Sequence, residues 1–290
     1  MKYRPLRTAL YLPANRASAV AKAREADCDA VILDLEDAVA PEAKGEAREA
    51  AIAAARAGGF GDRLLVVRVN ALDSEWGAAD CAALQGLDRQ ADAAAVLVPK
   101  LSSARQLSAY RTAVGDGPEL WAMLETCAAF LDLPAIAAAA KDAGLTTFVL
   151  GTNDLALEMR CTLDTGRSAM LPLLTQSVVA ARAHGLAVLD GVFNALENEA
   201  GFAAQCRQGA MLGFDGKTVI HPAQLTAANA AFGPSERDIA DAAKIVAAFA
   251  APENAGKGVI RLDGRMVEVL HLRQAERTLA ISTATRRDSA

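Results

Sequence analysis

Charged and amide side chains follow several short apolar runs of this sequence, at the point where each run ends. They are Asp34, Glu36, Asp37, Arg68, Asn70, Lys100, Glu125, Asn153 and Asp154. Where the ends of parallel strands meet, the carboxylates would repel one another and raise the pKa of at least one, unless a cation lies among them. Mg²⁺ accepts one or two carboxylates and completes its octahedron with water and substrate oxygens. Glu125 and Asp154, which end neighbouring runs, are therefore predicted to bind Mg²⁺, with Mn²⁺ as a substitute.

The other members of this group fit an anionic substrate. Arg68 is predicted to offer a bidentate fork to a carboxylate or a developing oxyanion. Lys100 and Asn153 are predicted to bind substrate, although Lys100 would equally serve as a salt-bridge partner for one of the acids. Asp37 is predicted to hold a metal-bound water, although the acids at 34–37 could instead favour the dipole of a following helix. The implied ligand is a small oxo or hydroxy acid, and no His cluster, GxSxG or Walker motif indicates other chemistry.

A scaffold must bring the ends of these runs together, and the sequence repeats one unit eight times. Each unit has a short β-branched apolar run, a polar turn and an Ala-rich stretch with helical spacing. The runs are residues 8–13, 30–35, 64–70, 94–100, 120–125, 147–151, 187–192 and 213–220. Such alternation predicts a parallel sheet, and eight units predict a (β/α)8 TIM barrel with its site at the carboxyl ends of the strands. An open doubly wound sheet is the alternative, disfavoured because no GxGxxG follows the first run.

The pattern changes after residue 220. Residues 221–251 predict two helices that would form the eighth helical layer of a barrel core at 1–220. Residues 259–269 alternate around Asp263-Gly264, a strong hairpin signal, and residues 272–282 predict a last helix. The segment 252–290 is thus predicted to be a C-terminal hairpin-plus-helix extension. A complete barrel leaves it little surface to cover, so we expect it to pack on a neighbouring subunit of a homo-oligomer, a trimer or a hexamer.

Composition narrows the class of protein. The 290 residues are 52% hydrophobic and 22% charged, which excludes a disordered chain and indicates a substantial core. Acidic and basic residues are interleaved, with a net charge of −5, so we expect no nucleic-acid partner. No apolar run approaches the length that spans a bilayer, and the basic N-terminus lacks the apolar region of a signal peptide. We therefore expect a cytoplasmic protein with no membrane partner. The five cysteines show no metal-ligand or disulfide spacing.

Seven ordered blocks also carry a family resemblance. They are RTALYLPA at 7–14, DLEDAV at 34–39, VRVN at 67–70, VPK at 98–100, LET at 124–126, GTNDL at 151–155 and GFDGKTVIHP at 213–222. The chain resembles the citrate lyase β-subunit-like branch of the HpcH/HpaI aldolase superfamily, whose members include malyl-CoA and citramalyl-CoA lyases. The resemblance implies a (β/α)8 barrel, Glu125 and Asp154 as metal ligands, and Arg68 as the substrate-binding arginine. It also implies an extension that reaches a neighbouring subunit.

Two departures from the family pattern concern catalysis and substrate fit. The family hairpin ends in an Asp that acts as acid/base in the neighbouring site, whereas Glu268 stands at that position here, with Leu270 in place of a Pro. Glu is one methylene longer, and a misplacement near 1 Å costs about 100-fold in rate. Ala128 and Ala129 stand where the family usually has a Gly shortly after the Glu-Thr pair, and their Cβ atoms would narrow the approach of substrate.

From these observations we expect a Mg²⁺-dependent carbon–carbon lyase that cleaves a citryl-, malyl- or citramalyl-type thioester to an acyl-CoA and a 2-oxo acid. Arg68, Asp37 and Glu268 are the predicted catalytic residues. One alternative is a malyl-CoA-type thioesterase, in which the same metal site directs water onto the thioester. Another is the β subunit of a multi-subunit citrate lyase, which acts on citryl groups bound to an acyl carrier rather than to CoA.

Overall fold

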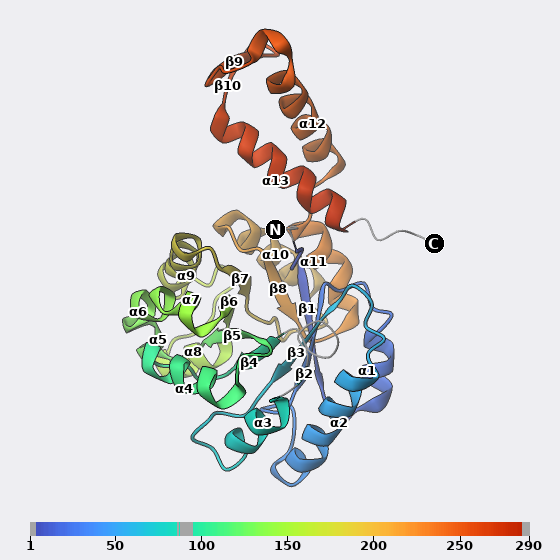
Figure 1. The fold of residues 1–290 in the computed structure, drawn as a ribbon, viewed down its shortest axis with the longest axis vertical. Coiled ribbons are helices and arrows are strands. Elements are labelled where there is room, and N and C mark those ends of the chain that lie inside the picture. The colour runs from blue at the N-terminus through green and yellow to red at the C-terminus, as the bar shows by residue number, and fades with distance from the viewer. Residues whose placement is uncertain (1–3, 86, 88–94, 286–290) are drawn as a thin grey trace. The chain divides into compact units, whose positions relative to one another are not determined.

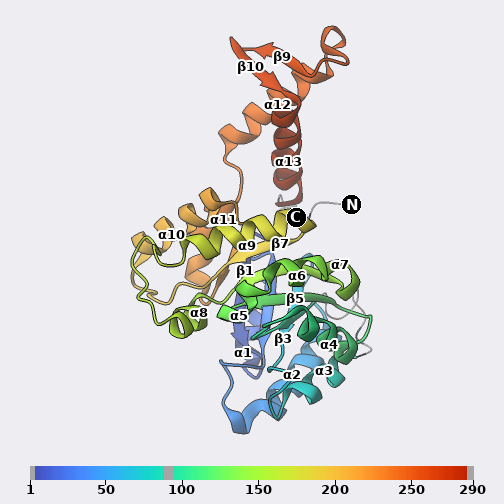
Figure 2. The same ribbon diagram turned by 90° about the vertical axis from the view of Figure 1, so that its left-hand side faces the viewer.

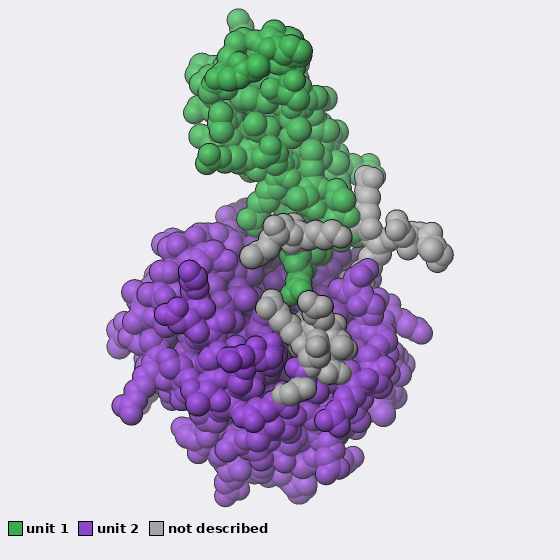
Figure 3. Space-filling view, viewed as in Figure 1, with its two compact units in different colours: residues 1–5, 230–290 green, residues 6–229 purple. Residues whose placement is uncertain are grey.

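The computed structural model describes residues 4–85, 87 and 95–285. The chain forms two compact units, residues 6–229 and residues 230–290 together with the N-terminal segment 1–5 (Figure 3). Among the described residues no helix is both long and apolar enough to cross a membrane.

The first unit is a closed barrel of eight parallel strands in sequence order, in which β1 pairs with both β2 and β8 (Figure 1). The strands are β1 (Thr8–Pro13), β2 (Ala30–Asp34), β3 (Leu64–Arg68), β4 (Ala95–Val98), β5 (Glu119–Leu124), β6 (Leu145–Leu150), β7 (Ala187–Asp190) and β8 (Gly216–Val219). Each strand lies within or next to one of the eight predicted apolar runs. The predicted (β/α)8 barrel is confirmed, and the open doubly wound sheet is excluded.

Helices follow the strands and cover the outside of the barrel. They are α1 (Ala17–Ala23), η1 (Pro41–Ala43), α2 (Lys44–Ala57), α3 (Gly77–Leu84), α4 (Ala104–Val114), α5 (Cys127–Leu131), α6 (Leu133–Ala138), α7 (Ala140–Ala143), α8 (Thr152–Met159), α9 (Leu171–His184), α10 (Glu199–Leu212), η2 (Pro222–Gln224) and the first five residues of α11 (Leu225–Phe232), which the division between the units crosses. The helices α5 and α6 are separate because Pro134, in the first turn of α6, lacks the amide hydrogen that a helix continuing from α5 would use.

Alternate strand residues point into the barrel, and the residues at the strand ends continue this inward series. On β3, Val66 belongs to the buried core and Arg68 follows two residues later; on β5, Met123 is followed by Glu125. Because side chains in a strand alternate between its two faces, the inward series leads from an apolar core to polar groups at the carboxyl end of the barrel. The period of the strands therefore places charged side chains at the mouth.

The second unit contains α12 (Glu236–Ala250), η3 (Pro252–Asn254), the hairpin strands β9 (Val259–Leu262) and β10 (Arg265–Glu268), and α13 (Val269–Thr285). Ser235 and Asp238 form a capping box at the start of α12, which packs along α13 (Figure 2). Asp263 and Gly264 both have positive φ angles, as the tight turn of a two-residue hairpin requires.

The division between the units lies at residues 229 and 230, whereas the sequence analysis placed the start of the extension at residue 252. The difference concerns α12, which was expected to belong to the outer layer of the barrel. It instead packs against α13 and β9, and so it belongs to the same compact unit as the hairpin.

Candidate active site

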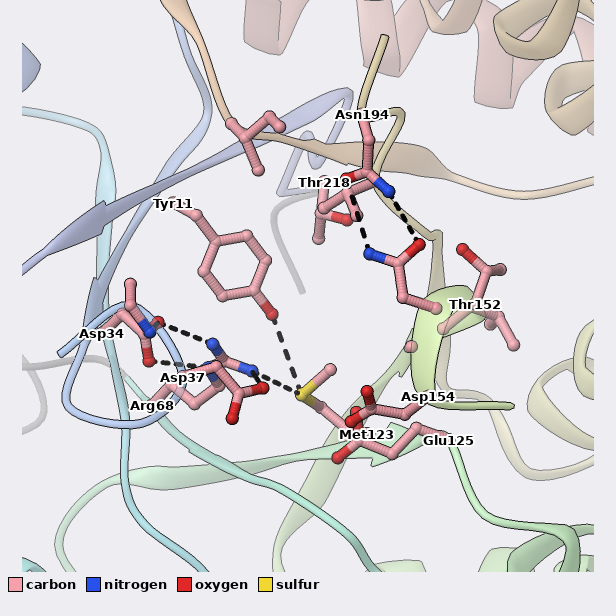
Figure 4. A pocket seen from close by; sticks show the side chains of 16 residues that line it. Tyr11, Asp34, Asp37, Arg68, Met123, Glu125, Thr152, Asp154, Asn194 and Thr218 are labelled. Atoms are coloured by element: carbon pink, nitrogen blue, oxygen red, sulfur yellow. Dashed lines mark hydrogen bonds and ion pairs between the residues drawn. The ribbon is translucent and has the colours of Figure 1, made fainter. Parts of the chain in front are cut away.

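The carboxyl ends of the barrel strands surround a cavity of about 320 Å³. Polar side chains from β1, β2, β3 and from the segments that follow β5, β6 and β7 line it, together with apolar side chains such as Met123 and Val192 (Figure 4). Five of the predicted site residues lie on its wall: Asp37, Arg68, Glu125, Asn153 and Asp154. The sequence predicted this convergence from the strand ends alone.

Arg68 is buried and held by acidic neighbours. Its Nε and Nη2 donate to the two carboxylate oxygens of Asp34 at 2.7 and 2.6 Å, because the two residues are register partners on β2 and β3. Its Nη1 lies 2.7 Å from a carboxylate oxygen of Glu36. The bidentate contact that the sequence analysis assigned to a substrate is therefore made with Asp34 through Nε and Nη2. Only Nη1 remains for a ligand in the cavity that Arg68 lines. Burial lowers the pKa of Arg68, but the hydrogen bonds and charge of Asp34 outweigh it, so the net shift is upward and the side chain stays cationic.

Glu125 and Asp154 form a carboxylate pair on the cavity wall. Glu125 follows β5 and is 2% exposed, whereas Asp154 lies in the first turn of α8, directly after β6. Burial and the charges of Glu36 and Asp154 raise the pKa of Glu125 to about 8. A cation between the two carboxylates would offset this repulsion.

The donor set fits a hard divalent cation. In the described part of the chain, no group of three or more His, Cys, Asp or Glu side chains is arranged to hold a metal ion. A cation at Glu125 and Asp154 would therefore have these two carboxylates as its protein ligands and would complete its shell with water and substrate oxygens. Mg²⁺ accepts this arrangement, because it usually keeps several waters and binds through one or two carboxylates.

Gly151 gives the Glu125 side chain its space. The two residues are neighbours across β5 and β6, and a Cβ atom at Gly151 would lie 2.4 Å from Oε2 of Glu125. Real Cβ atoms do not approach so closely, so any larger residue would push the carboxylate out of place. The geometry of such a site has to be held within about 0.5 Å, so it depends on the absence of a side chain at Gly151.

Replacing Gly151 with alanine is expected to leave the barrel folded and to lower kcat by about 100-fold, because a misplacement near 1 Å has that cost. Gly185, which ends α9 on the outside of the barrel, has no atom near its Cβ position, and it supplies the control Gly185→Ala. That control should lose some stability from its positive φ angle and keep its kcat. Steady-state kinetics of both variants check the prediction, and an unchanged kcat in Gly151→Ala would contradict it.

Lys100 contacts two residues of the site, Glu125 and Asp37, without lining the cavity itself. Its backbone N–H donates to Oε1 of Glu125 at 2.6 Å, and its φ angle of 49° is in the left-handed region that non-glycine residues seldom adopt. Its ammonium group lies 3.1 Å from Glu36 and 3.9 Å from Asp37, and half of the side chain is exposed. Lys100 is not among the cavity-lining residues. The geometry thus favours the salt-bridge role, with the backbone amide orienting Glu125.

Asp37 and Asn153 are exposed residues that line the cavity. The Asp37 carboxylate is 57% exposed and lies 3.6 Å from Nη1 of Arg68. Asn153 and Asn194 form two hydrogen bonds with each other. Asn194 Nδ2 donates to Asn153 Oδ1 at 2.9 Å, and Asn153 Nδ2 donates to Asn194 Oδ1 at 3.4 Å. The pair joins the segment after β6 to the loop after β7, and both residues line the cavity.

The loop after β2 is fixed by a buried lysine. Lys44 Nζ donates to the backbone oxygens of Leu35 and Glu36 and to Oδ1 of Asn70, at 2.7–2.8 Å. Asn70, one of the polar residues at the strand ends, also donates to Leu35 O and to Asp80. Asn70 therefore supports the loop that carries Glu36 and Asp37 and does not line the cavity.

The sequence analysis did not single out Tyr11, Met123 or Asn194 as site residues, although all three line the cavity. Tyr11 and Met123 lie inside apolar runs, where inward-facing residues are usually core. Asn194 lies in the loop beyond β7, and the strand-end rule would have found it had it been followed into that loop.

Three buried charges meet at the end of β7: Asp190, the last residue of β7, its register partner Lys217 on β8, and Arg167 from the segment between α8 and α9. Asp190 accepts from Nη1 of Arg167 at 2.6 Å and from Nζ of Lys217 at 3.1 Å, and all three side chains are at most 2% exposed. Lys217 also donates to the backbone oxygen of Gly191. The cluster thereby links the end of β7 to the segment that follows α8.

Glu268, the predicted acid/base, belongs to the second unit. It is the last residue of β10, is half-buried, and its N–H donates to Nδ1 of His271 at 3.0 Å. Its role in a neighbouring subunit stays a prediction.

Comparison with known proteins gives consistent results. A sequence profile of the HpcH/HpaI aldolase/citrate lyase family matches residues 7–222. A (3S)-malyl-CoA thioesterase from Cereibacter sphaeroides is 46% identical over 97% of this chain and 95% of its own. An L-malyl-CoA/beta-methylmalyl-CoA lyase from the same species is 32% identical over 94% of this chain and 93% of its own.

A solved structure adds the fold. CitE from Mycobacterium tuberculosis, in complex with magnesium, acetoacetate and coenzyme A, is 27% identical, with a TM-score of 0.76 over 98% of this chain and 100% of that chain. A second structure from that organism, a citrate lyase beta subunit with oxaloacetate and magnesium, is 28% identical, with a TM-score of 0.68 over 80% of this chain and 99% of that one.

Proposed function

This chain belongs to the HpcH/HpaI aldolase/citrate lyase family, and from that premise we propose that it is a Mg²⁺-dependent hydrolase of a malyl-type CoA thioester. The observation that carries the proposal is the convergence of Arg68, Glu125 and Asp154 on one cavity. The greater identity to (3S)-malyl-CoA thioesterases than to malyl-CoA lyases supports hydrolysis as the first reaction.

The residues divide into a metal-binding side and a charge-stabilising side. Glu125 and Asp154 would hold Mg²⁺, or Mn²⁺ as a substitute, and when bound the ion supplies Lewis acidity toward the oxygens of the hydroxy-acid end. The Nη1 edge of Arg68 stabilises the negative charge that develops on the thioester carbonyl. Asp37, exposed at the opening, accepts the proton of the attacking water. A C–O bond forms, the C–S bond breaks, and the proton passes to the CoA thiolate, so that malate and CoA are released.

Carbon–carbon cleavage is the second candidate, supported by the malyl-CoA lyases among the relatives. In that reaction the hydroxyl gives its proton to a carboxylate on the cavity wall, the bond between the hydroxyl-bearing carbon and the carbon next to the thioester breaks, and glyoxylate forms. Arg68 then stabilises the enolate of the acyl-CoA, and an acid returns a proton to its carbon. Glu268 of a neighbouring subunit would be that acid in the predicted homo-oligomer, a trimer or hexamer. The carrier-bound citryl reaction is the third candidate.

One incubation separates the three reactions. With (3S)-malyl-CoA and Mg²⁺ we expect free CoA thiol and malate to appear together, with no glyoxylate. Glyoxylate in step with acetyl-CoA would establish the lyase instead. Inertness toward CoA esters, with turnover of citryl groups on an acyl carrier, would establish the β-subunit role.

Metal removal tests the carboxylate pair in the same assay. We expect EDTA to abolish thiol release and added Mg²⁺ or Mn²⁺ to restore it, because two carboxylates facing one cavity lose their shared counter-charge. Dialysis of the chelated enzyme against metal-free buffer, followed by stepwise addition of the ion, measures the dependence. Full activity after chelation would contradict the metal requirement.

A further inference from the structure

Two hydrogen-bond donors converge on the sulfur of Met123. Arg68 Nη1 lies 3.7 Å from Sδ, and the Tyr11 hydroxyl lies 3.9 Å from the same atom (Figure 4). Tyr11 comes from β1, Arg68 from β3 and Met123 from β5, so the three side chains meet from three different strands of the barrel. The Tyr11 ring also lies against the guanidinium, 5.1 Å from its carbon, which fixes the hydroxyl relative to Nη1.

A thioether is a weak partner for such donors. Its sulfur is a poor acceptor, and neither contact has the length of a strong hydrogen bond. Within the part of the chain that the structure describes, the contact with Met123 Sδ is the one hydrogen bond of the Tyr11 hydroxyl. Burial raises the pKa of Tyr11 well above its ordinary value, and the Arg68 charge offsets this only in part. The phenol therefore keeps its proton and remains a donor.

We propose that Tyr11 is a further catalytic residue, whose hydroxyl and Arg68 Nη1 together bind the thioester carbonyl oxygen of the substrate at the place that the Met123 sulfur occupies. Unbranched methionine has three rotatable bonds, so it can move aside at small cost when the stronger acceptor arrives. Tyr11 transfers no proton: the water attacks the carbonyl carbon, and the two donors stabilise the oxyanion of the tetrahedral intermediate.

This assignment rests on the proposed thioester chemistry. The metal site at Glu125 and Asp154 would bind the hydroxy-acid end of the substrate. The thioester carbonyl is then left for the Tyr11 hydroxyl and Arg68 Nη1. A pair of donors that is already in place is worth more than the same pair in solution, because no solvent has to reorganise as charge develops. Tyr11 and Arg68 are held before substrate arrives, the first by its ring contact and the second by Asp34.

The test is Tyr11→Phe, which removes one oxygen and retains the ring and its contact with Arg68. Loss of one oxyanion donor costs about 100-fold or more in kcat, and we expect that loss with little change in KM. Tyr110→Phe is the matched control, since that hydroxyl accepts from Leu72 N–H outside the cavity, and its kcat should equal that of the wild type. An unchanged kcat in Tyr11→Phe would overturn the inference. So would a raised KM at constant kcat, which indicates a carboxylate at this place.

A measurement without turnover separates this inference from the proposed function. The probe is a ketone analogue of acetyl-CoA with a methylene in place of sulfur and ¹³C at the carbonyl carbon. Two donors polarise the carbonyl, so its stretching frequency should fall on binding to the wild type, and part of that fall should be lost in Tyr11→Phe. Equal shifts in both proteins would overturn the role of Tyr11 even if malyl-CoA is hydrolysed. Polarisation by Tyr11 without turnover of malyl-CoA would instead leave the donor pair standing and refute the proposed substrate.

Discussion

Replacing Glu125 with glutamine is expected to lower kcat for malyl-CoA by about 1000-fold, since a single group that stabilises the transition state can contribute on that order. The amide keeps the size of the side chain and the acceptor for the Lys100 N–H, but it removes the charge of one member of the Glu125–Asp154 pair. Binding of Mn²⁺, followed by electron paramagnetic resonance, should weaken in parallel. Thiol release at saturating substrate measures the kinetic effect.

Glu119 provides the matched control for that substitution. It lies at the other end of the same strand, is nearly as buried as Glu125, and accepts from the Thr146 hydroxyl at 2.7 Å. Because the amino end of a barrel strand contributes stability rather than chemistry, Glu119→Gln should keep both kcat and Mn²⁺ affinity. Equal losses in the two variants would mean that the strand, and not the carboxylate at the mouth, is responsible.

Replacing Asp190 with alanine is expected to destabilise the protein by about 3–5 kcal/mol, the usual cost of leaving a buried charge without its partner. Lys217 can release its proton to avoid this cost, but Arg167 cannot, and both side chains are almost fully buried. Asp190→Asn keeps an acceptor for one of the cations and should lose less. Urea denaturation followed by circular dichroism gives the free energies of unfolding.

Acid pH should reduce the difference between the wild type and Asp190→Asn. Burial raises the pKa of Asp190, but the charges of Lys217 and Arg167 outweigh it and the net shift is downward. The stability contributed by the ionised carboxylate is therefore complete above the pKa of an unfolded aspartate and is lost as the pH falls through the folded-state pKa.

Asp241→Ala, the control for Asp190→Ala, breaks only exposed pairs on α12 and should cost about 0.5 kcal/mol or less. If Asp190→Ala costs no more than this control, the cluster is not held by charge.

The sequence was sufficient for the barrel because each strand is a short apolar run and each run has its own helix-forming neighbour. The predicted polar turn is absent between β6 and α8, because α8 begins at Thr152 almost directly after β6 ends at Leu150. The packing of α12 on α13 depends on tertiary contacts that periodicity does not contain.

The sequence was less informative about the site, and the reason is specific to each residue. Arg68, Glu125 and Asp154 could be placed around one cavity because strand ends of a parallel barrel meet. The engagement of the Arg68 fork by Asp34 depends on the register of β2 and β3, which no single sequence reveals. Arg167 gave no signal at all, because it lies in an irregular segment and reaches Asp190 only through the tertiary fold.

The grip of Asp34 on Arg68 has a consequence for how the enzyme meets its substrate. A free arginine gives up about 2 kcal/mol of rotamer entropy when it is immobilised. Here that loss is incurred once, when the chain folds, and not again in every catalytic cycle. The substrate must therefore fit a cation of fixed position, and the carbonyl of a shorter or longer thioester cannot draw the guanidinium toward itself.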